Sequence, residues 1–199
     1  MFADFLTTRV AVPDFAAERV LREKGIQPQT LANWGVRWTS EPPAFAIPYR
    51  DLHGALIGVV ERLYDGKGPT YDNGRYWQYA DGSRPMGQFL FGLDRVLPSS
   101  EIILVEGFWD TMKLHQEGYV NALGLIGTRA TGRHQKLLQE LFPSASLLWV
   151  PDGDSPGRKW LQQPFFNHEA RRIALPAERD PDNLSREELL QLLGAPLRA

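Results

Sequence analysis

The nine residues Ile102–Asp110 constrain the fold more than any other stretch of the chain. Ile102–Val105 is a run of four apolar residues, which predicts a short buried strand. Glu106 follows where that strand stops, and Gly107 lets the chain turn because it has no Cβ. Residues Asp110–Glu117 favour a helix. In an open parallel sheet, functional residues collect where strands end and helices begin, so local sequence alone places Glu106 at a candidate functional position.

Two later stretches repeat this design. Leu147–Val150 predicts a second apolar strand, and an Asp-Gly-Asp turn follows it. Arg171–Pro176 predicts a third strand, followed by a loop that contains Asp-Pro-Asp. Three strand ends thus supply five carboxylates, which would repel one another unless a hard cation such as Mg²⁺ or Mn²⁺ bound to their oxygens. The five are Glu106, Asp152, Asp154, Asp180 and Asp182.

An Asp-Gly-Asp turn alone is usually solvated, because both residue types are favoured in turns for backbone reasons. The ordered set of Glu-Gly-x-x-Asp, Asp-Gly-Asp and Asp-Pro-Asp is more specific, and it resembles the TOPRIM domain shared by DnaG-type primases, topoisomerases and some nucleases. Val105–Asp110 resembles the acidic motif of that family, and Leu125–Thr128 is similar to its glycine-threonine turn. Asp152–Arg158 resembles the Asp-Gly-Asp-x-Ala-Gly motif with Pro156 in place of alanine, and Asp180–Leu184 matches the last acidic pair.

The resemblance implies an α/β fold in which residues 98–199 form a TOPRIM catalytic domain, a parallel sheet flanked by helices. It implies that Glu106 is the catalytic residue, as a metal ligand or a general base. It also implies a two-metal site for Mg²⁺ or Mn²⁺, held by Asp152, Asp154, Asp180 and Asp182. The chain contains no cysteine, so a zinc site built on thiolates is not expected.

Alternating apolar and helical stretches in the second half of the chain support this fold independently, because such alternation predicts a parallel sheet covered on both faces. Ser185 and Glu188 also have capping-box spacing for the last helix. The expected strands are 102–105, 120–125, 147–150 and 171–176, and the expected helices are 109–117, 131–141, one from about 158, and 186–193.

Residues 1–97 are expected to form a smaller α+β subdomain of the primase type. A helix is predicted over 15–24 with Asp14 as its cap, and a β-hairpin over 45–62. This hairpin ends in Arg62, as a similar hairpin does in primases. The aromatic-rich stretch Tyr71–Tyr79 is expected to be irregular. A Pro/Ser break at 97–100 marks the expected boundary between the halves.

Several arginines are candidates for contacts to nucleotide or DNA. Arg62 matches a functional position of the primase family. Arg50, Arg129 and Arg158 are also candidates, but each has an alternative interpretation as a solvated surface charge. Two lysines that primases usually carry are replaced here by Thr70 and Met86.

The formal net charge of −2 does not by itself indicate a nucleic-acid-binding protein. Removing the five proposed metal-binding carboxylates from that charge leaves +3, so the overall balance does not exclude nucleic acid. No apolar run has the length needed to span a membrane, and the first twenty residues contain no signal-peptide core. A cytoplasmic protein with no membrane partner is expected.

Three functional readings remain open. The first is a primase core that makes RNA primers on a single-stranded DNA template from NTPs, working with a separate template-recognition or helicase protein. The second is a metal-dependent TOPRIM nuclease, and the third is a non-catalytic nucleic-acid-binding relative. The primase-type first half favours the first reading over the second, and the intact acidic set argues against the third. No segment resembles the zinc-binding or helicase-binding domain of primases.

Overall fold

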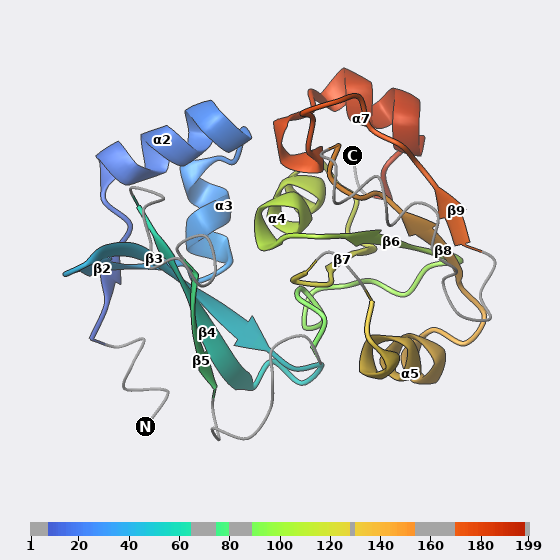
Figure 1. Cartoon of the computed structure of the whole chain (residues 1–199), viewed down its shortest axis with the longest axis horizontal. Coiled ribbons are helices and arrows are strands. Elements are labelled where there is room, and N and C mark those ends of the chain that lie inside the picture. The colour runs from blue at the N-terminus through green and yellow to red at the C-terminus, as the bar shows by residue number, and fades with distance from the viewer. Residues whose placement is uncertain (1–7, 65–74, 80–88, 128–129, 154–169, 198–199) are drawn as a thin grey trace. The chain divides into compact units, whose positions relative to one another are not determined.

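The computed structural model describes residues 8–64, 75–79, 89–127, 130–153 and 170–197 (Figure 1). The chain divides into two compact units, Met1–Met86 and Gly87–Ala199.

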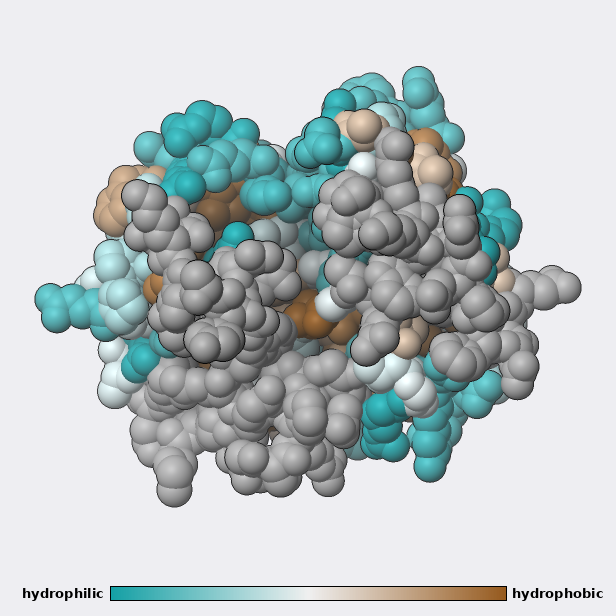
Figure 2. All heavy atoms as spheres, viewed as in Figure 1, coloured by the Kyte–Doolittle hydropathy of each residue, from teal (hydrophilic) through white to brown (hydrophobic). Residues whose placement is uncertain are grey.

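In the part of the first unit that the structure describes, an antiparallel sheet of five strands in sequential order β1-β2-β3-β4-β5 lies together with two helices. Its core consists of β3 and β4, which pair over most of their length, and of the buried face of α2. The outward face of α2 is largely hydrophilic (Figure 2). The elements are β1 Val10–Ala11, α2 Asp14–Lys24, α3 Pro28–Asn33, β2 Arg37–Ser40, β3 Pro43–Arg50, β4 Leu56–Leu63 and β5 Arg75–Tyr79.

Two expectations for this unit need correction. The irregular structure expected over 71–79 is wrong for Arg75–Tyr79, which forms strand β5 against β4. Tyrosine and tryptophan favour strands, and pairing with β4 satisfies the backbone groups of this segment. Asp14 is the first residue of α2 instead of its cap, because Pro13 occupies the N-cap position. Gly25 ends this helix in the left-handed conformation at φ 62°, which glycine adopts without strain.

The second unit is built on a parallel sheet with strand order β7-β6-β8-β9, which confirms the expected α/β fold. Its elements are β6 Glu101–Val105, α4 Phe108–Gln116, β7 Ala122–Gly124, α5 Gly132–Leu141, β8 Ser146–Trp149, β9 Ala170–Arg172, the 3-10 helix η2 Pro181–Asn183 and α7 Arg186–Leu193. The expected helix from about residue 158 lies outside the described residues.

Strand β6 is buried on both faces, which explains its continuous apolar sequence. Successive side chains of a strand point to opposite faces, so Ile102 and Leu104 pack in one hydrophobic cluster while Ile103 and Val105 pack in another. The first cluster includes residues of α5, and the second includes residues of α4 and α7. Accordingly, α5 covers one face of the sheet and α4 and α7 cover the other (Figure 1). Among the described residues, no helix is long and apolar enough to cross a bilayer.

Residues 89–97, which the sequence interpretation assigned to the first half, lie in the second unit. Phe91 forms an antiparallel bridge with Gly124, with Phe91 N–H to Gly124 O at 2.8 Å and the reciprocal bond at 3.0 Å. Leu90 and Leu93 are buried in the same cluster as β6. This pairing joins residues far apart in sequence, which the Pro/Ser break at 97–100 could not reveal.

Two histidines are held neutral in the interior of the second unit. His134 is fully buried; its Nδ1 accepts a hydrogen bond from the Thr131 N–H at 3.2 Å, and its Nε2 lies 3.0 Å from the carbonyl oxygen of Phe89. The proton therefore resides on Nε2, which donates to that carbonyl. Burial lowers the pKa of His134 to about 4. Burial likewise lowers the pKa of His115 to about 4.

The two histidines are therefore expected to contribute a loss of stability as the pH drops from about 6.5 to about 4. Above pH 6.5 these histidines are neutral in both the folded and the unfolded state. Between pH 6.5 and pH 4 they become protonated in the unfolded chain but stay neutral in the folded chain. At pH 5 the expected cost for His134 is about 2 kcal/mol, from its folded pKa of about 4. Urea unfolding at pH 7 and pH 5 measures this loss. His134→Gln should lose less stability over that interval than wild type, whereas His53→Gln, at an exposed turn, should match wild type.

Candidate active site

Glu106 and Asp152 lie together at the carboxyl edge of the sheet. Strands β6 and β8 are parallel neighbours, so the residues that follow them meet at one edge. The Asp152 N–H donates a hydrogen bond to Glu106 Oε1 at 3.3 Å. Only 6% of Glu106 is exposed to solvent. The carboxylate of Glu106 is thus fixed by the backbone of the second acidic motif.

Asp110 joins the first acidic motif to the third. One of its oxygens, Oδ2, accepts the Gly107 N–H at 2.9 Å, and the other, Oδ1, accepts the Asp182 N–H at 3.2 Å. Both Asp110 and Asp182 are nearly fully buried. Sequence reasoning included Asp110 in the Glu-Gly-x-x-Asp pattern but gave it no role. Its position three residues after Gly107, at the start of α4, was the available signal, because carboxylates there satisfy unpaired N–H groups.

The second and third acidic motifs are tied together by their backbones. The Gly153 N–H donates to the carbonyl oxygen of Arg179 at 2.7 Å, and the Glu178 N–H donates to the carbonyl oxygen of Gly153 at 3.4 Å. The Asp-Pro-Asp segment, expected as a loop, forms the 3-10 turn η2, with Asp180 at its N-cap. Residues after three strands are therefore linked into one hydrogen-bonded edge.

Electrostatic repulsion is concentrated on Asp152. Burial, and after it the carboxylates of Asp110, Glu106, Asp180 and Asp182 in that order, together raise the pKa of Asp152 to about 9. Its Oδ1 is buried and has no hydrogen-bond partner among the residues that the structure describes. A buried, unpartnered carboxylate oxygen surrounded by other carboxylates is a suitable ligand for a hard divalent cation.

The described residues do not by themselves enclose a metal ion, since they contain no group of three His, Asp or Glu side chains in a ligand-like arrangement. Asp154, Arg129 and Arg158 lie outside the described residues, as do Thr70 and Met86. Asp180 and Asp182 are close enough to Asp152 to raise its pKa. The donor chemistry of the described residues fits a divalent cation.

The two remaining candidates belong to the first unit. Arg50 Nη1 donates to the carbonyl oxygen of Gly54 at 2.8 Å, so its side chain braces the turn between β3 and β4. Arg62 lies on β4, opposite Phe45 of β3, and is partly exposed. The hairpin that carries Arg62 was predicted from the sequence and is confirmed by the strands β3 and β4.

Comparison with known proteins identifies this arrangement. Residues 103–184 match the Toprim-like family. A DNA primase of Pseudomonas putida is 32% identical over 190 residues, which cover 88% of this chain and 27% of that protein. A DNA primase of Deinococcus radiodurans is 30% identical over 143 residues, covering 67% of this chain and 24% of that protein. The chain belongs to the DnaG-type primase family.

Solved structures of DnaG-type primases have the same fold. The RNA polymerase domain of the Mycobacterium tuberculosis primase aligns with a TM-score of 0.73 at 18% identity, covering 96% of this chain and 78% of that one. A DNA primase domain from Pseudomonas aeruginosa aligns with a TM-score of 0.73 at 23% identity, covering 94% of this chain and 73% of that one. The chain spans about a quarter of the length of the curated DnaG-type relatives given above. Its Toprim-like domain implies the use of a divalent metal ion.

Proposed function

We propose that this chain is the catalytic core of a primase, which makes RNA primers on single-stranded DNA by metal-dependent nucleotidyl transfer from NTPs. The observation that carries the proposal is the buried Oδ1 of Asp152, which has no hydrogen-bond partner within the described part of the chain and lies among four other carboxylates at the carboxyl edge of the sheet. The relationship to DNA primases supports it, because the alignment with the Pseudomonas putida primase covers 88% of the chain and so extends beyond the Toprim-like segment.

In this proposal Asp152, Asp154, Asp180 and Asp182 hold Mg²⁺ or Mn²⁺, and zinc has no thiolate to bind. The bound cations would neutralise charge on the triphosphate and activate the attacking hydroxyl. Glu106, held by the Asp152 N–H, serves as a ligand or a general base. Asp110 holds the first and third motifs at a fixed separation, because both of its oxygens accept backbone hydrogen bonds.

The proposed partners are a single-stranded DNA template, NTPs and a separate template-recognition or helicase protein. A DnaG primase catalytic domain bound to single-stranded DNA has the same fold, with a TM-score of 0.69 at 19% identity. The likeness supports the choice of template for the test of this chain.

The test incubates the full chain with single-stranded DNA, labelled NTPs and Mg²⁺ or Mn²⁺, and separates the products by size. Template-dependent RNA products support the primase proposal. Cleavage of the template without synthesis would instead identify a nuclease. DNA binding with neither product would identify a non-catalytic relative. Omitting the metal, or replacing Asp152 by asparagine, should remove the products if the carboxylates act as proposed.

The Arg62→Ala variant is expected to bind single-stranded DNA more weakly, by about 10-fold at low salt. A single lost phosphate contact also lowers the steepness of the salt dependence, by roughly one unit in the slope of log affinity against log salt. Fluorescence anisotropy over a salt series measures both quantities. Arg37→Ala, which removes an exposed arginine from β2 of the same sheet, is the matched control. Equal affinities and slopes for wild type and Arg62→Ala would make Arg62 a structural residue.

A further inference from the structure

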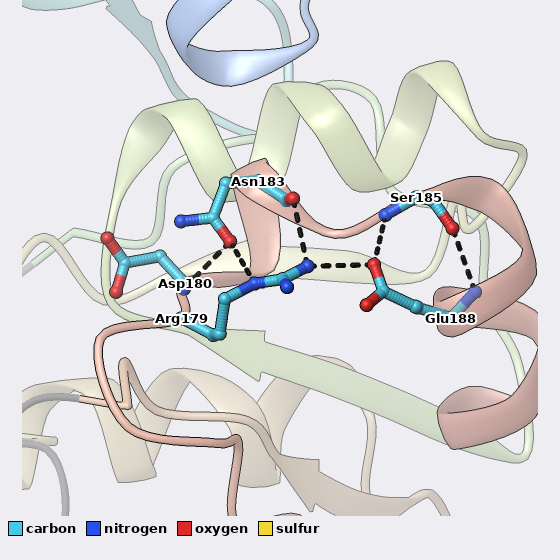
Figure 3. A network of polar contacts seen from close by, with 5 residues as sticks. All are labelled: Arg179, Asp180, Asn183, Ser185 and Glu188. Carbon is cyan, nitrogen blue, oxygen red and sulfur yellow. Dashed lines mark hydrogen bonds and ion pairs between the residues drawn. The ribbon is translucent and has the colours of Figure 1, made fainter.

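The side chain of Arg179 joins the last acidic motif to helix α7 (Figure 3). Its Nε donates to Asn183 Oδ1 at 2.9 Å, and its Nη2 donates to the Asn183 carbonyl oxygen at 3.2 Å. The same Nη2 lies 2.8 Å from Glu188 Oε2, in an ion pair with the first turn of α7. One guanidinium thus contacts both the turn that carries Asp180 and Asp182 and the helix that follows it.

The groups that Arg179 contacts are themselves fixed by backbone hydrogen bonds. Asn183 Oδ1 also accepts the Asp180 N–H at 3.3 Å. Glu188 Oε2 accepts the Ser185 N–H at 2.7 Å, and the Ser185 hydroxyl accepts the Glu188 N–H at 3.2 Å. The expected capping box of α7 is therefore present, and it presents Glu188 to the guanidinium (Figure 3). The segment between Asp180 and α7 is held at both ends.

The backbone of Arg179 reaches the second acidic motif. Its carbonyl oxygen accepts the Gly153 N–H at 2.7 Å, immediately after Asp152. A displacement of Arg179 would consequently move Gly153 on one side and the turn containing Asp182 on the other. The Asp182 N–H in turn donates to Asp110, so the displacement would also reach the first motif.

We propose that Arg179 is a positioning residue that sets the spacing of the metal-binding carboxylates. This inference rests on the proposed metal-dependent function. The side chains of Arg179 and Glu188 are 36% and 42% exposed, so their ion pair contributes little to global stability. A planar guanidinium that donates to three acceptors fixes geometry, however, which a lysine ammonium does not do in the same way. Arg179 is therefore expected to affect metal binding more than stability, because residues that contact metal ligands set the orientation of those ligands.

Charge and positioning predict opposite effects on cation binding. Removing a positive charge beside a carboxylate cluster should tighten the binding of a divalent cation, if only the field matters. Loosening the turn that carries Asp180 and Asp182 should weaken it. Arg179→Gln therefore separates the two explanations by the sign of the change. Arg179→Lys keeps the positive charge and loses the planar set of guanidinium donors. A purely electrostatic role therefore predicts unchanged cation binding for that variant.

The experiment measures Mn²⁺ binding to the full chain by electron paramagnetic resonance, without substrate. Arg179→Gln and Arg179→Lys are each expected to weaken Mn²⁺ binding by about 10-fold. The matched control is Arg171→Gln, which removes an arginine paired with Glu101 at 2.6 Å, at the opposite end of β6 from Glu106. The control should bind Mn²⁺ as wild type does, and the melting temperatures of the three variants should agree closely.

Asn183→Ala provides a second variant with unchanged net charge, since it removes the oxygen that accepts from both Arg179 Nε and the Asp180 N–H. It should weaken Mn²⁺ binding as Arg179→Lys does, and the double variant should be no weaker than either single one. In primer assays, the Mn²⁺ concentration for half-maximal rate should rise about 10-fold while the rate at saturating Mn²⁺ is retained.

Unchanged or tighter Mn²⁺ binding in both Arg179 variants would overturn the positioning role, and so would equal weakening in Arg171→Gln. Should the Arg179 variants fail to fold, Asn183→Ala with wild-type affinity would overturn it as well. Failure of the proposed function has a different signature, because wild type itself would then make no primers, whether or not it binds Mn²⁺. If wild type binds Mn²⁺ and the Arg179 variants bind it with the same affinity, only the positioning role of Arg179 is rejected.

Discussion

Glu106→Gln is expected to reduce primer synthesis by about 10³-fold while leaving the fold intact, because a positioned general base contributes on this scale. Glutamine keeps the Oε1 acceptor for the Asp152 N–H at 3.3 Å, so the contact between the two motifs survives. It cannot accept a proton, and it is a poorer metal ligand than a carboxylate. Single-turnover primer extension at saturating Mn²⁺ measures the loss.

The same variant is expected to be more stable than wild type in the absence of metal, by about 1 kcal/mol. Removing the Glu106 charge reduces the repulsion among these carboxylates, which adds to the effect of burial in raising the pKa of Asp152. Glu101→Gln, at the other end of β6, is the matched control and should retain activity. A Glu106→Gln variant with wild-type synthesis would remove Glu106 from the catalytic set. A less stable variant would show that Glu106 is a structural residue.

The elements that the sequence predicted are those whose signals are local. Strand β6 follows from four consecutive apolar residues that fill two clusters on opposite faces of the sheet. Helix α7 follows from Ser185 and Glu188, whose spacing alone specifies the capping box. Glu106 was predicted to lie at a strand end because only the order of strand, carboxylate and glycine was needed. Each of these signals lies within a few residues of the element that it specifies.

The features that the sequence did not reveal depend on partners far along the chain. Asp110 gains its role from the N–H of Asp182, which is 72 residues away. Strand β5 forms because β4 offers it an edge, and no local pattern in Arg75–Tyr79 specified that pairing. Arg179 is unremarkable in sequence, since its importance arises from the Gly153 N–H and from acceptors on η2 and α7. Local patterns therefore supplied the carboxylates, and tertiary contacts supplied the groups that hold them.

The tightest of these tertiary contacts predicts the largest effect on stability. Gly153→Ala is expected to destabilise the second unit by about 3 kcal/mol, near the upper end of the usual cost of overpacking. An added Cβ would overlap the carbonyl oxygen of Pro176 and lie 2.6 Å from that of Arg179. Both obstacles are backbone atoms, so no side-chain rotation can relieve them. The third motif would have to move away from Asp152, and Mn²⁺ binding should be lost as well.

Thermal and urea unfolding with and without Mn²⁺ test this expectation, and the melting temperature of the variant should fall by about 10 °C. Gly132→Ala is the matched control, because an added Cβ there meets nothing within 4 Å and Gly132 is exposed in the first turn of α5. Alanine has the higher helix propensity, so the control should be stabilised by about 0.5 kcal/mol. A Gly153→Ala variant with wild-type stability would mean that the backbones of Gly153 and Arg179 do not approach this closely in solution. The hydrogen bond between them would then no longer support Arg179 as the residue that spaces the acidic motifs.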